Sequence, residues 1–183
     1  MLIKQYTTEW VNQYQRLRDV LSLGLNSCNF EIEHVGSTAV PGLDAKEIID
    51  IDIIYETPED FSGVKSVLQR LGYYHNGDQG IKDREVFKRE KSQSHPFLDA
   101  ITHHLYVCIK GSHALSEHLL FRNYLRTNEK ARADYQQLKH HLASQVNQHR
   151  KAYNRLKETA AREFIQSILE LAKSEQSQWP NRS

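Results

Sequence analysis

Two carboxylates, spaced two residues apart in an apolar run, are the feature of this sequence best suited to chemistry. Asp50 and Asp52 lie within the run Ile48-Ile49-Asp50-Ile51-Asp52-Ile53-Ile54. The alternation predicts a β-strand in which both carboxylates project from one face, about 7 Å apart along the strand. Buried like charges need a compensating cation, either basic side chains or a metal. Oxygen ligands of this kind suit Mg²⁺, which usually binds through one or two carboxylates and the phosphates of a substrate.

A glycine-serine turn stands shortly before this strand. Twelve residues separate Gly36-Ser37 from Asp50. Backbone N–H groups in such a turn offer phosphate a fixed set of donors. The alternatives are a simple tight turn at Gly36-Ser37 and a structural role for the two carboxylates, bonded to Lys46, Arg84 or a neighbouring turn.

Three basic side chains are further candidates for a site. Adjacent residues of a strand point to opposite faces, so His103 and His104 do not chelate one ion, and only His104 is a candidate ligand or base. Arg122 and Arg126 are spaced by four residues and share one helical face, where they could bind phosphates or a carboxylate substrate. The alternative for this pair is a solvated basic stripe.

The elements that must position these residues follow from periodicity and turn signals. Alternation predicts strands near residues 30–35, 47–55, 73–75, 84–89 and 102–109. Helical spacing predicts a first helix that ends before Gly24, a second that begins after Thr57, and three helices from residue 113 onward. The first helix, with Trp10, either covers the sheet or forms a dimer contact.

This order of elements predicts an α+β fold with a C-terminal helical layer. We expect an α+β core over residues 1–112, a helical region over 113–172 and a disordered tail over 173–183, where the sequence is polar.

Charge and composition exclude several classes of partner. The 183 residues include 24 Lys and Arg and 23 Asp and Glu, a formal charge of +1 that gives no long-range field for nucleic acid. No stretch approaches the roughly 18 apolar residues of a membrane span. We therefore expect no membrane association. Cys28 and Cys108 lie far apart without a CxxC pattern, so we expect both to be free thiols in a reducing cytoplasm.

Several segments carry a resemblance to a known family: Glu33-His34-Val35-Gly36-Ser37-Thr38-Ala39-Val40-Pro41-Gly42-Leu43, Ile48-Ile49-Asp50-Ile51, His104-Leu105-Tyr106-Val107, Phe121-Arg122-Asn123-Tyr124-Leu125-Arg126 and residues 135–139. Together they closely resemble the signature of the GrpB-like family over roughly residues 5–172. That family looks like a branch of the nucleotidyltransferase superfamily. The resemblance implies a mixed β-sheet flanked by helices, with the later helices closing a substrate cleft. Lys139, Tyr153 and Lys157 match the helical pattern of the family and are expected to reach toward that cleft.

By this resemblance the chain is expected to transfer a nucleotidyl group from a nucleoside triphosphate to an unknown small acceptor. Asp50 and Asp52 would hold Mg²⁺, and Gly36 and Ser37 would contact the triphosphate. His104 would act as an auxiliary ligand or base, and Arg122 or Arg126 would anchor the acceptor. Active nucleotidyltransferases usually bring a third carboxylate from a later strand, and the segment Thr102-His103-His104-Leu105-Tyr106-Val107-Cys108 contains none. The alternative is therefore a catalytically degenerate nucleotide-binding or scaffold protein with the same fold.

Overall fold

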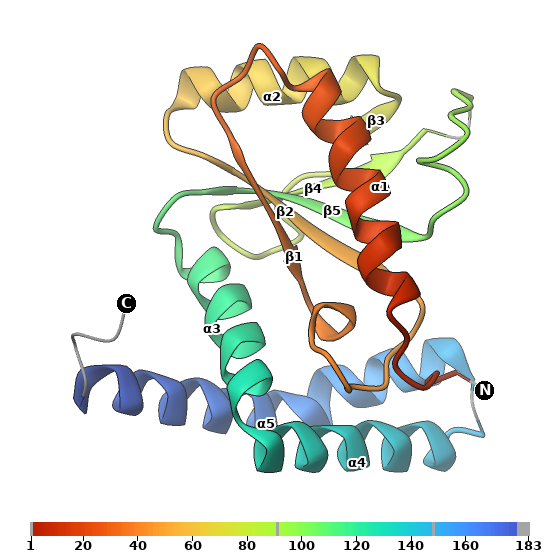
Figure 1. The fold of residues 1–183 in the computed structure, drawn as a ribbon, viewed down its shortest axis with the longest axis vertical. Coiled ribbons are helices and arrows are strands. Elements are labelled where there is room, and N and C mark those ends of the chain that lie inside the picture. Colours follow the sequence, from red (N-terminus) through yellow and green to blue (C-terminus); the bar gives the residue numbers. More distant parts are fainter. Residues whose placement is uncertain (1, 91, 148, 179–183) are drawn as a thin grey trace.

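A five-stranded mixed β-sheet forms the centre of the computed structural model, which describes residues 2–90, 92–147 and 149–178 (Figure 1). Its strands, in sequence order, are β1 (Glu31–Val35), β2 (Ile49–Tyr55), β3 (Tyr73–His75), β4 (Arg84–Arg89) and β5 (His103–Ile109). Their order across the sheet is β1-β2-β5-β4-β3. β2 and β5 are parallel, and the other neighbours are antiparallel. The mixed sheet confirms the predicted fold class.

Two helices cover the apolar face of this sheet. They are α1 (Glu9–Gly24) and α2 (Pro58–Arg70). Trp10 and Leu17 of α1 pack in one buried cluster with Ile51 of β2 and Val64 of α2. Trp10 is 1% exposed, so α1 covers the sheet, which is the first of the two roles considered for this helix from the sequence. α2 begins where predicted because Thr57 forms a capping box with Asp60.

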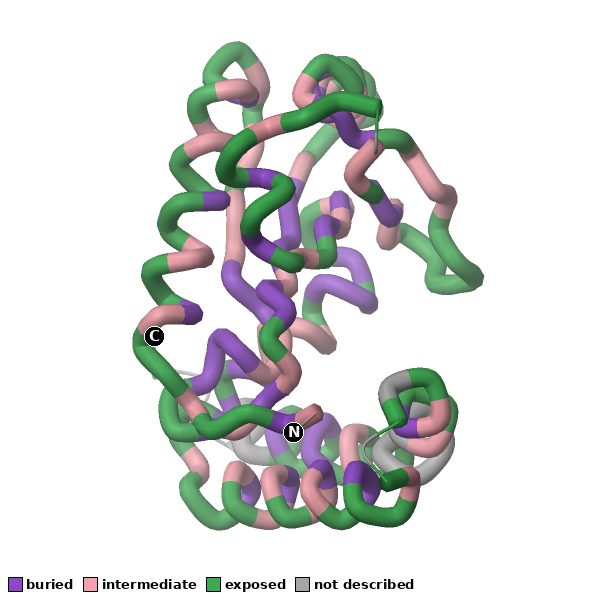
Figure 2. The backbone as a smooth tube through the Cα atoms, turned by 90° about the vertical axis from the view of Figure 1, so that its right-hand side faces the viewer, coloured by how far each residue is buried: buried purple, intermediate pink, exposed green. Residues whose placement is uncertain are grey.

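Three further helices lie on the opposite side and below the sheet (Figure 1). They are α3 (His113–Thr127), α4 (Glu129–Gln145) and α5 (Arg150–Gln178). Their common core is a second apolar cluster that includes Leu125, Tyr135, Leu142, Tyr153 and Ile168. Figure 2 shows buried stretches concentrated in the strands and on the inner turns of the helices, while the outer turns are exposed.

The segment between β1 and β2 joins the sheet to these helices. It contains a short 3-10 helix, η1 (Ser37–Ala39), and then Asp44, whose backbone N–H donates to Gln136 Oε1 at 2.9 Å. The Asp44 carboxylate bonds His140 Nε2 at 2.7 Å, and the Asp44 carbonyl accepts from Lys139 Nζ. Two adjacent turns of α4 are thereby fixed against the segment that precedes β2.

The structure differs from the sequence-based expectations at one boundary. α5 continues to Gln178, past residue 172, where the helical region was expected to end. Residues 179–183, the rest of the expected tail, lie outside the described residues. Cys28 and Cys108 are free, as predicted. In the described part of the chain, no helix has the length and apolarity needed to cross a bilayer.

Candidate functional site

The turn after β1 is built around a glycine that touches a carboxylate. Gly36 has φ +72°, a left-handed conformation that side chains other than glycine rarely adopt. A Cβ at this position would lie 2.3 Å from Asp50 Oδ2. Ser37 follows directly and opens η1. The structure therefore brings Gly36, Ser37 and Asp50 together, although twelve residues separate the turn from the carboxylate.

A buried histidine ties this turn to the start of β2. His34 Nε2 lies 3.1 Å from Thr38 Oγ1, and Thr38 Oγ1 donates its proton to the Ile48 carbonyl at 3.1 Å. The Thr38 hydroxyl has a single proton, so His34 Nε2 must be the donor in their mutual bond. The His34 ring stacks on Tyr14 of α1, and burial lowers the pKa of His34 to about 4, which keeps the ring neutral.

Asp50 forms a dyad with the predicted histidine. His104 Nδ1 donates to Asp50 Oδ1 at 2.8 Å. The two residues are register partners across the parallel β2–β5 pair, so their side chains share the polar face of the sheet. His103 points away and bonds Tyr73 at 2.6 Å, which confirms that adjacent histidines diverge. The Asp50 side chain is one quarter exposed and the His104 side chain about one half, so both reach solvent.

Asp52 is held by a histidine that sequence reasoning missed. It is fully buried, and His118 Nδ1 of α3 donates to Asp52 Oδ2 at 2.8 Å. Burial lowers the pKa of His118, but the hydrogen bond and charge of Asp52 outweigh it, so the net pKa is raised and the cation is favoured. Helical spacing carried a signal for this role, because His118 lies between Leu115 and Arg122 on the side of α3 that faces the sheet.

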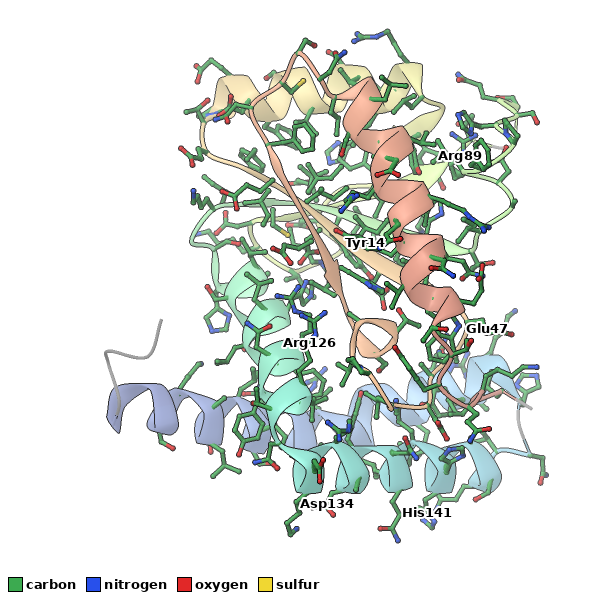
Figure 3. The ribbon with its side chains drawn as sticks, in the orientation of Figure 1. Tyr14, Glu47, Arg89, Arg126, Asp134 and His141 are labelled. Atoms are coloured by element: carbon green, nitrogen blue, oxygen red, sulfur yellow. The ribbon has the colours of Figure 1, made fainter. Side chains whose placement is uncertain are left out.

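The side chains of Arg122 and Arg126 are bonded within the protein. Arg122 is 8% exposed and donates to Glu33 Oε2 at 2.5 Å and to the His34 carbonyl at 2.8 Å. Arg126 Nε donates to the Ala39 carbonyl at 2.9 Å (Figure 3). Neither side chain lines the cavity described next. Both arginines hold α3 against β1 and η1, because those carbonyls need donors, and a role of either as an acceptor anchor stays a prediction.

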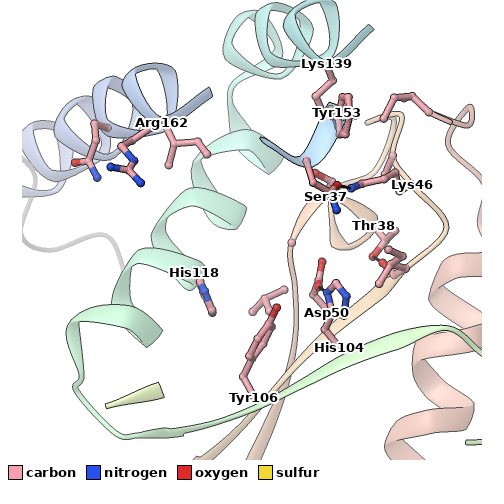
Figure 4. Close-up of a pocket in the computed structure, with 18 residues that line it drawn as sticks. Ser37, Thr38, Lys46, Asp50, His104, Tyr106, His118, Lys139, Tyr153 and Arg162 are labelled. Carbon is pink, nitrogen blue, oxygen red and sulfur yellow. Dashed lines mark hydrogen bonds and ion pairs between the residues drawn. The ribbon is translucent and has the colours of Figure 1, made fainter. Parts of the chain in front are cut away.

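A cavity of about 520 Å³ lies between the polar face of the sheet and the C-terminal helices (Figure 4). Gly36, Ser37, Asp50 and His104 line it together with Thr38, Tyr106 and His118. The helical side adds Lys139, Tyr153, Asn154, Arg162 and Gln166. Lys139 and Tyr153 thus lie where the family resemblance implied, whereas the side chain of Lys157 lies outside the described part of the structure. Carboxylate and imidazole stand at one end of the cavity, and three basic side chains, Lys46, Lys139 and Arg162, come from its other walls.

The basic side chains of this cavity are fixed by their surroundings. Lys46 Nζ donates to Asn154 Oδ1 at 2.5 Å and lies 4.8 Å from the centre of the Tyr153 ring. Lys139 is only 2% exposed, and its amine lies 4.9 Å from the Tyr135 ring. Contacts of this kind stabilise an ammonium group away from bulk water. The cavity therefore combines preset positive charge with a carboxylate–imidazole pair.

The structure brings Asp50, but not Asp52, to the wall of this cavity. The two carboxylates nevertheless offer oxygen ligands of the kind that Mg²⁺ takes together with the phosphates of a substrate. Asp52 Oδ1 is buried and makes no hydrogen bond within the described residues. Asp50 Oδ2 lies in the space that a side chain at Gly36 would fill. No group of three or more His, Cys, Asp and Glu side chains suited to a metal occurs in the described parts of the chain. Two carboxylates are nevertheless a common protein contribution to Mg²⁺ when phosphates complete the coordination.

Sequence comparison relates the chain to several bacterial proteins. A family model described as GrpB protein matches residues 1–170. The chain is 34% identical over 149 residues to UPF0157 protein PA4798 of Pseudomonas aeruginosa. This match covers 81% of this chain and 60% of that protein. With UPF0157 protein YqkA of Bacillus subtilis it shares 31% over 140 residues, 76% of this chain and 39% of the relative. The chain thus spans less than two thirds of either relative.

Solved structures extend the comparison to the fold. The conserved protein GrpB from Enterococcus faecalis is 29% identical, with a TM-score of 0.75 over 94% of this chain and 98% of that one. The Cid1 poly(U) polymerase bound to MgATP superimposes with a TM-score of 0.56 over 78% of this chain and 44% of the polymerase, at 14% identity. The second likeness shows a shared fold alone. Because the family model matches most of its length, the chain belongs to the GrpB family, and its fold is nucleotidyltransferase-like.

Proposed function

We propose that this protein is a Mg²⁺-dependent nucleotidyltransferase that moves a nucleotidyl group from a nucleoside triphosphate to a small acceptor. The observation that carries the proposal is the contact between the Gly36 turn and Asp50, which lines a 520 Å³ cavity with basic side chains opposite. A phosphate-binding turn against a carboxylate is the combination that metal-assisted phosphoryl chemistry needs. The fold that this chain shares with a MgATP-bound polymerase supports the same reading.

The basic walls of the cavity suit a triphosphate. Ser37 and the start of η1 present backbone N–H groups and a hydroxyl beside Asp50. Lys46, Lys139 and Arg162 come from three other segments and provide positive charge for the phosphate oxygens. Because Lys46 and Lys139 are already held by Asn154 and the Asp44 carbonyl, little conformational entropy is lost when an anion binds.

His104 is placed to accept the proton of the nucleophile. A carboxylate only accepts hydrogen bonds, so Nδ1 of His104 carries the proton donated to Asp50, and Nε2 of the neutral ring is free to accept one. The acceptor hydroxyl oxygen bonds to the α-phosphorus, and its proton passes to His104 Nε2. The bond from the α-phosphorus to the bridging oxygen breaks, and pyrophosphate leaves with the electron pair. Asp50 stabilises the resulting imidazolium.

Magnesium would be held by Asp50 Oδ2 and Asp52 Oδ1, and it would neutralise charge on the phosphate oxygens when bound. His118 lines the cavity and bonds Asp52, so it stands between this carboxylate and solvent. In the absence of metal, Asp52 keeps the hydrogen bond from His118 Nδ1 at 2.8 Å as its partner.

A second candidate function is nucleotide binding without turnover. The observation that favours it is the register of β5, where His104 stands opposite Asp50 and Tyr106 stands opposite Asp52. No carboxylate occupies either position on the strand that usually brings the third acid. This alternative keeps the cavity and its affinity for a triphosphate but releases no pyrophosphate.

Thermal stability with nucleotides tests the proposal first. A ligand that binds only the folded state raises the unfolding midpoint. We expect a Mg²⁺-dependent rise with a nucleoside triphosphate for the wild type, and none for Asp50→Asn. Gly36→Ala should weaken nucleotide binding by at least about tenfold, because its Cβ would displace Asp50.

Gly77→Ala is the matched control for this experiment. Gly77 also has a positive φ, +68°, but a Cβ there meets no atom within 4 Å. The control variant therefore also places a side chain at a positive φ but without a steric contact, and it should keep the nucleotide affinity of the wild type. Equal binding by wild type and Asp50→Asn would contradict the proposed site. Binding without pyrophosphate release, across a panel of hydroxyl and amine acceptors, would favour the non-catalytic alternative.

A further inference from the structure

A second cavity, of about 480 Å³, opens where β4 and β5 separate. The paired register of these strands runs from Arg84 opposite Cys108 to Phe87 opposite Leu105. Beyond Phe87 the strands diverge, and residues from both faces of the sheet line the space between them. Its apolar walls are Val86, Phe87, Leu98, Ile101 and Leu105. These side chains are buried or nearly so, which makes the cavity a preformed apolar site.

Most polar groups in this cavity already have partners. Arg89 donates to Asp99 Oδ1 at 2.8 Å, to the Gln93 carbonyl at 2.8 Å, and to the Leu71 carbonyl. His103 Nδ1 donates to the Ile101 carbonyl at 2.7 Å, so Nε2 accepts from the Tyr73 hydroxyl. Burial lowers the pKa of His103, which keeps this ring neutral. These groups are bonded mainly to acceptors and donors of the protein itself.

Arg84 differs from them because its guanidinium has unused donor capacity. Its Nε is buried and makes no hydrogen bond in the described part of the chain. The guanidinium carbon lies 4.8 Å from the centre of the Tyr106 ring, which holds the cation against the aromatic face. A buried donor without an acceptor costs free energy, and an anionic oxygen would remove that cost. Lys88 and Arg89 also line the cavity against a single acid, Asp99, so its charge favours an anion.

The second cavity adjoins the first through shared walls. His104 and Tyr106 line both. The Tyr106 ring is close to both the proposed base and the Arg84 cation, with its centre 6.2 Å from the His104 ring and 4.8 Å from the Arg84 guanidinium carbon. A small molecule with its anionic end on Arg84 would therefore extend along Tyr106 and present its other end to His104.

We propose that this second cavity binds the acceptor, and that the acceptor is a small molecule with an apolar body, one anionic group that contacts Arg84, and a hydroxyl or amine that faces His104. The acceptor role rests on the proposed function, whereas the anion site at Arg84 stands on the cavity itself. Arg84 thus determines specificity, because it selects acceptors by their anionic group, which lies at the opposite end of the molecule from the hydroxyl or amine that reacts.

The experiment measures binding of three matched probes without nucleotide. Phenyl phosphate and benzoate carry an apolar ring and an anionic group, and benzamide is their uncharged counterpart. Ligand-observed NMR titrations would give the dissociation constants for the wild type, Arg84→Gln and Arg70→Gln. Arg70 is an exposed residue at the end of α2 and lines neither cavity, so Arg70→Gln makes the same charge change elsewhere. MgATP binding by thermal shift is measured on each variant in parallel.

We expect Arg70→Gln to bind each anion with the same affinity as the wild type. Both proteins should bind benzamide at least about tenfold more weakly than the anions. Arg84→Gln should lose about tenfold or more for both anions and keep its MgATP response, which also shows that it is folded. Anion binding that survives in Arg84→Gln, or anions that bind no better than benzamide up to about 10 mM, would overturn the proposal. If MgATP does not raise the unfolding midpoint of the wild type, while anion binding still depends on Arg84, the proposed function is overturned and the acceptor role with it.

Discussion

One face of β2 is an isoleucine surface and the other carries two carboxylates, although both faces come from the same seven-residue strand. Ile49, Ile51 and Ile53 are fully buried beneath α1 and α2. Asp50 and Asp52 face α3 and the C-terminal helices, and each is bonded to one imidazole. The apolar face is stabilised by buried area, which is non-directional. The polar face depends on pairs whose members come from different elements.

The difference shows how far each face tolerates change. Loss of one isoleucine removes a share of a large cluster, whereas loss of one histidine leaves a specific carboxylate without its partner. His104 and His118 come from β5 and α3, and Glu33 on the same face is held by Arg122. A buried ion pair contributes little net stability but becomes costly when one partner is removed. The polar face therefore serves the site more than the stability of the fold.

The largest expected effect breaks the apolar face. Ile51→Ala should reduce the free energy of unfolding by about 2–5 kcal/mol, because Ile51 is fully buried and the cavity it leaves is only partly refilled. Its neighbour variant Asp50→Asn, on the partly exposed polar face, should change stability far less while it abolishes nucleotide binding. Urea unfolding of both variants measures the contrast. Equal destabilisation by the two substitutions would show that the faces do not differ in this way.

A smaller effect should follow when the polar face loses its buried pair. His118→Asn should reduce the free energy of unfolding by about 3 kcal/mol at pH 7, because Asp52 remains fully buried without a counter-charge. Adding Asp52→Asn should restore part of that loss. His113→Asn on the same helix removes an exposed histidine 3.6 Å from Glu117 and should leave stability nearly unchanged. A loss shared by both single variants would assign the effect to α3 rather than to Asp52.

The smallest effect concerns a histidine on the apolar side. The pKa of His34 is about 4 in the folded protein, below the unfolded value near 6.5. Between these values the unfolded chain binds the extra proton, so stability falls as pH falls, by about 2 kcal/mol from pH 7 to pH 5. His34→Gln keeps a donor for Thr38 but does not titrate, so this part of the pH dependence should vanish. A wild-type-like pH dependence in that variant, measured by urea unfolding, would refute the assignment.

Local patterns were enough to predict the elements that position the site. The alternation around Asp50 identified β2 and its two faces, and the capping residues at Thr57 identified the start of α2. His104 could be chosen over His103 because neighbouring residues of a strand diverge. Each of these inferences depends on residues within a few positions of one another, where backbone geometry decides the outcome.

Long-range partners could not be predicted in the same way. Arg122 and Arg126 do share a helical face, as their spacing required, but their acceptors are Glu33 and backbone carbonyls about ninety residues earlier. His118 was missed although its spacing placed it on the same face. Lys46 and Arg84 were considered as partners of the carboxylates, and the structure bonds those carboxylates to histidines instead.

The sequence by itself determined the family, the α+β order of elements, and the strand on which two carboxylates share a face. Only the tertiary structure decided that β5 lies beside β2, that His118 covers Asp52, and that Arg84 faces a second cavity with an unused donor. The physical reason is the range of the interactions. Periodicity and capping act within a turn or a strand, whereas the pairing of a buried charge depends on which distant segment packs against it.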